Sequence, residues 1–254
     1  MKLSIIISVL NSHEILRRQL LHFSRIGLPD DVELIIMDDG SNPPLTDTVG
    51  IPNLRIIPTG NTHEPGASTG WTVELARNQG ARLARGEYLL MTDIDYIIPR
   101  AAIDGVYTLQ EDKSGFHREF GILDENGILT QDLAILRKYG LNEQRIQGRG
   151  TKIPPHPNNF IMRKSTFWQL GGYREDLSSR PYPNKGDTYF KREWAKAYEA
   201  GKVTIRSADQ RATLYMFPNG QFCGDVDYNP FNLFHDLTRK TDSNHWYLNP
   251  RYNT

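Results

Sequence analysis

Several features that mark particular classes of protein are scarce or missing in this 254-residue sequence. Cys223 is the single cysteine, which excludes an internal disulfide bond and fits a reducing compartment. Lysine and arginine together number 30, as do aspartate and glutamate, so the net charge favours neither nucleic acid nor an anionic membrane as a partner. No apolar run approaches the roughly 20 residues that a transmembrane helix needs.

The N-terminal apolar run at residues 3–10 is too short for a spanning helix and lacks a small-residue cleavage site, so we interpret it as a core strand. We therefore expect a soluble, cytoplasmic protein, with any lipid contact peripheral. Internal repeats and low-complexity segments are also missing, and the length suits one compact α/β domain, residues 1–254.

Buried strands and helices alternate in the first hundred residues, which is typical of a parallel sheet with helices on both faces. The strands predicted from apolar, β-branched runs are residues 3–9, 33–37, 54–57 and 88–91. The first predicted helix follows Ser12 as its N-cap, and its apolar spacing turns Arg17 and Arg18 away from the core. The second helix, residues 71–84, contains Gly80, which costs about 1 kcal/mol relative to alanine and predicts the close approach of a strand or ligand.

Two carboxylates follow the strand at residues 88–91, namely Asp93 and Asp95. Residues two apart in an extended segment point to the same side, so these two can converge on one cation that would neutralise a diphosphate. A solvated acidic turn is the alternative, because an Asp-x-Asp triplet is common.

A second pair, Asp38 and Asp39, follows the strand at residues 33–37. Ligands of open α/β sheets bind at the carboxyl ends of strands, so this pair belongs to the same predicted site. Asp38 is equally suited to capping the turn at residues 40–41.

Weaker patterns follow in the second half of the chain. The predicted helices are residues 101–110, 165–170 and 187–200, and the predicted strands are 159–162, 203–205 and 213–217. Residues 141–158 are irregular and carry Arg145, Arg149, Lys152 and His156, which suits either a lid over an anionic substrate or a solvated basic loop.

Four short motifs follow one another in the first half of the chain. They are Ser8-Val9-Leu10-Asn11, Met37-Asp38-Asp39-Gly40-Ser41, Ala76-Arg77-Asn78-Gln79-Gly80 and Thr92-Asp93-Ile94-Asp95. In this order they resemble the GT-A glycosyltransferases, most closely family 2. The resemblance implies a Rossmann-like, nucleotide-binding open sheet flanked by helices, with a fused acceptor-side subdomain. Residues 1–98 would form the nucleotide-sugar-binding half, and residues 99–254 the acceptor-binding half with the tail.

The same resemblance implies which residues bind the nucleotide-sugar. They are Ser8, Leu10, Asn11, Asp38, Asp39, Arg77, Asn78 and Asp93. Asp39 would accept a hydrogen bond from the ring N–H of uracil, and Arg77 would offset phosphate charge or brace the aspartates. Arg77 alternatively suits a helix-surface ion pair. Leu10 stands where many relatives carry an aromatic residue against the base, a departure that weakens the indication of uridine.

In the second half, Phe160 to Phe167 and the following Leu170-Gly171-Gly172-Tyr173 resemble the segment before the family's catalytic carboxylate. Asp187 then matches the general base, although it also suits the N-cap of the helix that it opens. The family pattern Gly-Glu-Asp-x-Asp is replaced here by Lys185-Gly186-Asp187-Thr188-Tyr189, so one of three acids is kept.

The tail resembles the β-1,4-galactosyltransferases around His235-Asp236-Leu237-Thr238-Arg239-Lys240, where a histidine completes the metal site. The resemblance implies that Asp93, Asp95 and His235 hold Mn²⁺ or Mg²⁺, a mixed oxygen and imidazole set that suits manganese. A structural histidine is the alternative for His235.

Together these motifs imply a metal-dependent, inverting glycosyltransferase that moves a sugar from a UDP-sugar to an acceptor hydroxyl of a glycan, a glycolipid or another hydroxylated acceptor. A hydroxymethylated base in viral DNA is the alternative acceptor. A nucleotidyltransferase that makes nucleotide-sugars would carry a glycine-rich, lysine-bearing loop after the first strand, where Asn11-Ser12-His13-Glu14 stands instead. A non-catalytic nucleotide-sugar-binding module is the third alternative.

Overall fold

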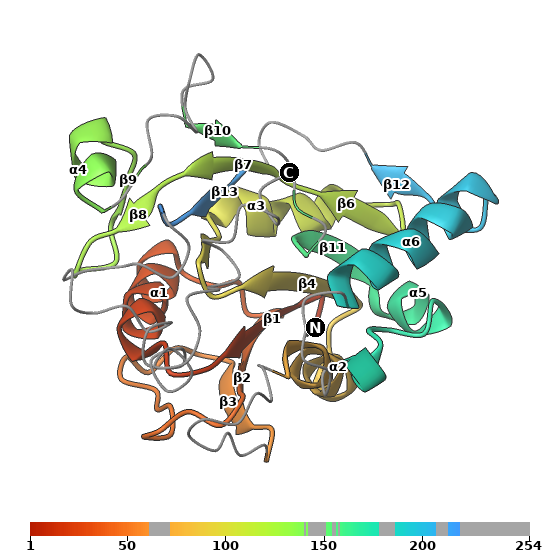
Figure 1. Ribbon diagram of the computed structural model, residues 1–254, viewed down its shortest axis with the longest axis horizontal. Coiled ribbons are helices and arrows are strands. Elements are labelled where there is room, and N and C mark those ends of the chain that lie inside the picture. The colour runs from red at the N-terminus through yellow and green to blue at the C-terminus, as the bar shows by residue number, and fades with distance from the viewer. Residues whose placement is uncertain are drawn as a thin grey trace, which may run out of the picture.

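The computed structural model describes residues 1–60, 72–139, 141, 151–153, 156, 158–177, 186–206 and 213–218. A seven-stranded sheet runs through this part of the chain, with strand order β12-β6-β11-β4-β1-β2-β3 and helices on both faces (Figure 1). Among these residues there is no helix with both the length and the apolar character needed to span a bilayer.

The N-terminal part of the sheet is parallel, as predicted. Its strands are β1 (Leu3–Val9), β2 (Val32–Asp38), β3 (Leu54–Pro58) and β4 (Tyr88–Asp93), and its helices are α1 (His13–Ile26) and α2 (Val73–Leu83). β1 lies between β2 and β4, so that Leu3 pairs with Val32 on one side and with Tyr88 on the other. All residues of β1 and β2 are buried, because helices cover both faces of these strands.

The sheet continues beyond β4 with strands that run in mixed directions. β11 (Phe160–Arg163) pairs antiparallel with β4, β6 (Lys113–Gly115) pairs antiparallel with β11, and β12 (Ile205–Arg206) pairs parallel with β6. The antiparallel direction of β11 places its first residue beside the end of β4, since Phe160 pairs with Met91. The start of β11 therefore meets the carboxyl edge of the parallel strands.

Two smaller sheets and the remaining helices complete the described fold. One sheet has the order β10-β7-β13-β5, and the other pairs β8 with β9. Their strands are β5 (Tyr96–Ile97), β7 (His117–Phe120), β8 (Ile122–Leu123), β9 (Leu129–Thr130), β10 (Lys152–Ile153) and β13 (Thr213–Met216). The helices are α3 (Arg100–Asp104), η1 (Gly105–Thr108), α4 (Leu133–Lys138), α5 (Lys164–Gln169), η3 (Glu175–Leu177) and α6 (Gly186–Glu199). The single helix predicted at 101–110 is thus a short α-helix followed by a 3₁₀ turn.

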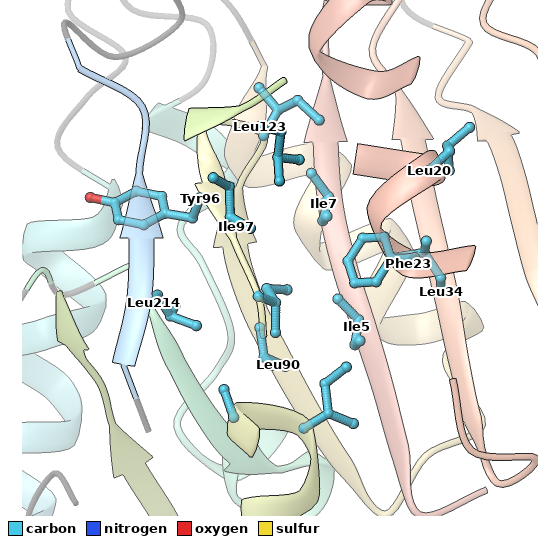
Figure 2. Close-up of a cluster of buried hydrophobic side chains, with 14 of the residues drawn as sticks. Ile5, Ile7, Leu20, Phe23, Leu34, Leu90, Tyr96, Ile97, Leu123 and Leu214 are labelled. Atoms are coloured by element: carbon cyan, nitrogen blue, oxygen red, sulfur yellow. The ribbon is translucent and has the colours of Figure 1, made fainter. Parts of the chain in front are cut away.

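Alternation along β1 divides the core into two layers. Ile5 and Ile7 pack with Phe23 of α1 and with residues of β2, β4, β5, β8 and β13 (Figure 2). Ile6 points to the opposite face, where α2, α5 and α6 lie (Figure 1). Gly80 of α2 touches this second face closely, because a Cβ there would lie 2.7 Å from Cγ2 of Ile6. The close strand approach predicted at Gly80 is confirmed.

One prediction about α1 is wrong, and another is confirmed in position only. Arg18 does not face solvent and is only 7% exposed. Its guanidinium donates hydrogen bonds to Oε1 of Glu14 at 2.8 Å and to the carbonyl of Leu123 at 2.9 Å. β8 packs over this helix, and Arg18 satisfies its carbonyl. Ser12 occupies the N-cap position, but its Oγ donates to the carbonyl of Leu10 at 3.0 Å instead of accepting from the helix.

Candidate active site

Arg77 and Asp93 form an ion pair at the carboxyl edge of the sheet. Asp93, the last residue of β4, pairs in register with Ser8 of β1 and shares a face with Met91, which packs under α2. Arg77 reaches Asp93 from α2, and its side chain is only 2% exposed. Arg77 was predicted either to offset phosphate charge or to brace the aspartates. The ion pair with Asp93 is the contact that the second role requires.

The electrostatic surroundings of Arg77 include three carboxylates. Burial disfavours the guanidinium cation, but the charges of Asp93, Glu74 and Asp187, with a contribution from the Tyr173 hydroxyl, outweigh burial and raise the pKa of Arg77. Arg77 therefore stays protonated although it is buried. Its charge links an aspartate of β4 to the predicted base at the start of α6.

Asp95 lies in the turn between β4 and β5, not in an extended segment as predicted. Ile94 between the two aspartates is 1% exposed, and its carbonyl accepts a hydrogen bond from Nε2 of Gln19 at 3.0 Å. Burying Ile94 turns the chain, so Asp93 and Asp95 approach each other through a turn and not through the strand pleat.

The carboxylate of Asp95 is held in a costly environment. Its Oδ1 is buried and has no hydrogen-bond partner, and the residue is 7% exposed. Burial, reinforced by the charge of Asp93, raises the pKa of Asp95 to about 7. A divalent cation would supply the missing partner and offset both charges, so the donor chemistry of this pair fits Mn²⁺ or Mg²⁺.

Asp38 and Asp39 serve opposite faces of the sheet. Asp38 caps the following turn, because its two oxygens accept the backbone N–H groups of Ser41 at 2.8 Å and Leu45 at 2.9 Å. Asp39 is fully buried and accepts from the hydroxyl of Thr72 at 2.6 Å and from its backbone N–H at 2.9 Å. Asp39 is therefore anchored to the residue that precedes α2.

The end of β1 is tied to the same turn. The backbone of Asn11 is left-handed (φ 50°), and its Oδ1 accepts the N–H of Asn42 at 2.8 Å, while its own N–H donates to Oγ of Ser41 at 2.9 Å. Leu10 is buried, and so is Ser8, whose Oγ lacks a hydrogen-bond partner. Hydrogen bonds thus join the end of β1 to the turn after β2, and the two strand ends form one corner of the site.

Asn78 bonds to the second half of the chain. Its Nδ2 donates to the carbonyl of Tyr173 and to Oε1 of Glu175, both at 2.8 Å, and its Oδ1 accepts the N–H of Tyr173 at 3.0 Å. Gly172 has φ 65°, and a Cβ there would lie 2.9 Å from Oδ1 of Asn78. Glycine at position 172 thus allows α2 and the segment after α5 to meet.

Residues just before β11 reach the site because this strand is antiparallel. Oδ1 of Asn159 accepts a hydrogen bond from Oγ1 of Thr92 at 2.8 Å, and its Nδ2 is buried without a partner. Burial lowers the pKa of His156, against the opposing charge of Asp93. The sequence prediction included His156 only in a basic loop and missed Asn159, because strand direction leaves no local signal in the sequence.

Asp187 lies in the first turn of α6 and is half-buried. Its Oδ1 accepts the N–H of Thr188 at 2.6 Å and the hydroxyl of the same residue at 3.2 Å. These contacts orient its side chain in the first turn, but Asp187 is the second residue of α6 and not the predicted N-cap. Its charge acts on Arg77.

The third predicted metal ligand, His235, lies outside the described residues, as do Arg145 and Arg149 of the predicted lid. In the part of the chain that the structure describes, no group of three or more histidine, cysteine, aspartate or glutamate side chains is placed to hold a metal ion. Asp93 and Asp95 are thus the two predicted ligands whose positions are known.

Comparison with known proteins identifies the fold. No protein-family model and no curated protein sequence matches this chain. Among solved structures, S. aureus TarS gives a TM-score of 0.53 at 17% identity over 94% of this chain, and TarS 1-349 in complex with UDP-GlcNAc gives 0.53 at 16% identity over 94%. The mannosyltransferase PcManGT from Pyrobaculum calidifontis, in complex with GDP-Man and Mn²⁺, gives 0.50 at 16% over 87%.

These structures are GT-A glycosyltransferases, and the chain described here has the GT-A fold. It spans 39%, 65% and 58% of the lengths of those three chains.

Proposed function

We propose that the protein is a metal-dependent, inverting glycosyltransferase of family 2 type that transfers a sugar from a UDP-sugar to an acceptor hydroxyl. The observation that carries the proposal is the buried carboxylate of Asp95 beside Asp93, at the carboxyl edge of β4, with its Oδ1 unpartnered. A buried pair of like charges is unfavourable on its own and becomes favourable when a cation joins it.

On the donor side, Asp93 and Asp95 would hold Mn²⁺ or Mg²⁺ with His235 as the third ligand. The bound cation would supply positive charge beside the diphosphate that leaves the sugar. Arg77 holds the Asp93 carboxylate in place through their ion pair. Because Arg77 is buried and stays protonated, this orientation is independent of pH in the working range.

The nucleotide would lie along the corner made by the ends of β1 and β2. Asp39 would accept the ring N–H of uracil, and Ser8, Leu10 and Asn11 would line the same side. Asp38 supports this corner, because its two oxygens accept backbone N–H groups of the turn after β2. Asn78 would lie near the nucleotide-sugar from α2, where it bonds to Tyr173 and Glu175. The solved TarS and PcManGT complexes hold UDP-GlcNAc and GDP-Man, which supports a nucleoside-diphosphate sugar as the donor class.

On the acceptor side, Asp187 would act as the general base. A carboxylate within about 3 Å of the acceptor hydroxyl takes its proton while the oxygen attacks the anomeric carbon. One base and one displacement invert the configuration at that carbon. Asn159 bonds to Thr92, the neighbour of Asp93, and His156 is close enough to feel the charge of Asp93, so both would contact the sugar or the acceptor.

Isothermal titration of UDP, with Mn²⁺ and with chelator, tests the donor site. We expect binding that requires Mn²⁺, its loss in Asp95→Asn, and its retention in Asp187→Asn. Asp30→Asn, which changes an exposed aspartate, is the matched control. Equal UDP affinity in the wild type and Asp95→Asn would exclude the metal assignment, and a preference for GDP would exclude uridine.

Transfer itself is tested by incubating UDP-sugars with the protein and measuring the release of UDP, with water or an added glycan as the acceptor. Asp187→Asn should bind UDP like the wild type and release it about 100-fold more slowly or worse, the scale of general-base catalysis. Unchanged turnover in Asp187→Asn would remove this residue from the catalytic role.

A further inference from the structure

A carboxylate outside the four motifs enters the site from α2. Glu74 is the second residue of this helix and is 2% exposed. Its Oε1 accepts the backbone N–H of Gly186, the first residue of α6, at 3.2 Å. The contact joins the start of one helix to the start of another that is 112 residues away in the sequence.

Glu74 also fills the space in which a side chain at position 186 would lie. A Cβ on Gly186 would come within 2.3 Å of both Cγ and Oε1 of Glu74, a distance that real side chains do not tolerate. Gly186 immediately precedes Asp187. The carboxylate of Glu74 thus lies beside the residue that precedes Asp187, and glycine at position 186 leaves room for it.

The charges around Arg77 place Glu74 in the same cluster. Glu74, Asp93 and Asp187 all act to raise the pKa of Arg77. Glu74 and Arg77 are three residues apart on α2, so they lie on one face of that helix. One face of α2 thus contacts the start of α6 through Glu74 and the end of β4 through Arg77.

We propose that Glu74 is a positioning residue that holds Asp187 in place for proton removal from the acceptor. The inference rests on the proposed function of Asp187 as the base. The first N–H groups of a helix have no partner within the helix, and Glu74 supplies one to the first residue of α6. Loss of this contact frees the turn that carries Asp187, and a displacement of about 1 Å can cost roughly 100-fold in rate.

Two substitutions separate the hydrogen bond from the charge. Glu74→Ala removes the acceptor atom and the filled volume, whereas Glu74→Gln keeps a carbonyl oxygen of the same reach. We expect Glu74→Ala to lower kcat for UDP release from a UDP-sugar by about 100-fold while KM for the donor and the UDP affinity with Mn²⁺ stay unchanged. Glu74→Gln should retain most of kcat. Glu193→Ala, which removes an exposed glutamate of α6, is the control.

Amide hydrogen exchange measures the contact without any turnover. In Glu74→Ala the N–H groups at the start of α6 should exchange faster than in the wild type, and in Glu74→Gln they should exchange at the wild-type rate. A double-mutant cycle with Gly186→Ala adds a test of direct contact. Gly186→Ala alone should accelerate exchange and lower kcat relative to the wild type. Added to Glu74→Ala, it should change neither quantity further, because the side chain that it would clash with is gone.

The outcomes distinguish this inference from the proposed function. If exchange in α6 and kcat are both unchanged in Glu74→Ala, Glu74 does not position Asp187. A selective loss of UDP affinity in Glu74→Ala would also overturn the inference, because it would place Glu74 on the donor side. If the wild type fails to bind UDP with Mn²⁺, the proposed function fails, while the exchange measurement still decides whether Glu74 holds α6.

Discussion

Replacing Asp95 with asparagine should stabilise the metal-free protein at alkaline pH. Burial, with the nearby charge of Asp93, raises the pKa of Asp95 from an ordinary 3.8 to about 7. The folded protein therefore holds a proton that the unfolded chain has already lost between these two pH values. Stability falls with rising pH wherever the unfolded state binds fewer protons than the folded state. The free energy of unfolding should therefore decrease as pH rises from about 4 to about 7.

The size of this effect follows from the shift. One pKa unit corresponds to about 1.4 kcal/mol, so a shift of roughly three units costs up to about 4 kcal/mol above pH 7. Asparagine resembles the protonated carboxyl group and carries no charge at any pH. Asp95→Asn should therefore match the wild type near pH 4, and should unfold with a free energy up to about 4 kcal/mol larger at pH 8.

Urea denaturation in chelator across this pH range measures the difference. Adding Mn²⁺ should then reverse the order at pH 8, because ligand that binds the folded state alone stabilises the wild type but not Asp95→Asn. Asp30→Asn, in an exposed position, should follow the wild type throughout. If the difference in the free energy of unfolding between the wild type and Asp95→Asn stays constant from pH 4 to pH 8, the argument that burial of this charge is costly is refuted.

Three further predictions concern the fold around the site. Gly80→Ala should destabilise the protein in urea unfolding, because its Cβ would lie 2.7 Å from Cγ2 of Ile6 and overpacking costs about 1–3 kcal/mol; Gly105→Ala, with open space around it, should be neutral. Arg77→Met should cost about 3 kcal/mol by leaving Asp93 without its partner, and Arg77→Met with Asp93→Asn should recover part of that loss. Burial lowers the pKa of Lys113 from 10.5 to about 8, so between these pH values the unfolded chain binds more protons than the folded protein. The free energy of unfolding should therefore rise with pH between about 8 and 10.5 in the wild type but not in Lys113→Met.

The sequence predicted the parallel part of the sheet well because its strands are buried on both faces. β1, β2 and β4 are continuous apolar runs that a single window detects. By contrast, β5, β8, β9 and β10 have two residues each and were not predicted, and β6 reads Lys-Ser-Gly. β12, also of two residues, overlaps the strand predicted at 203–205 in one residue only. Such short strands form because a neighbouring strand offers hydrogen bonds, which is a property of tertiary structure and leaves no periodic pattern.

The candidate site shows the same division. The positions of Asp38, Asp39, Asp93 and Arg77 at one edge follow from strand ends and from a helix between them, both readable in the sequence. The turn at Asp95 depends on burying Ile94, and the approach of Asn159 depends on the direction of β11. The contact of Glu74 with Gly186 spans the chain, so only the packing of α2 against α6 reveals it.

The pairing of β4 with β11 also limits how a substrate can enter. Four residues of β11 pair with Tyr88 to Met91 of β4, so strands on both sides of the site belong to one continuous sheet. Opening the site by swinging its two sides apart would break this ladder and expose its backbone groups. For the strands that the structure describes, closing the site by a hinge between two separate lobes would therefore require breaking the β4–β11 ladder, so smaller movements at the edge of this sheet are favoured.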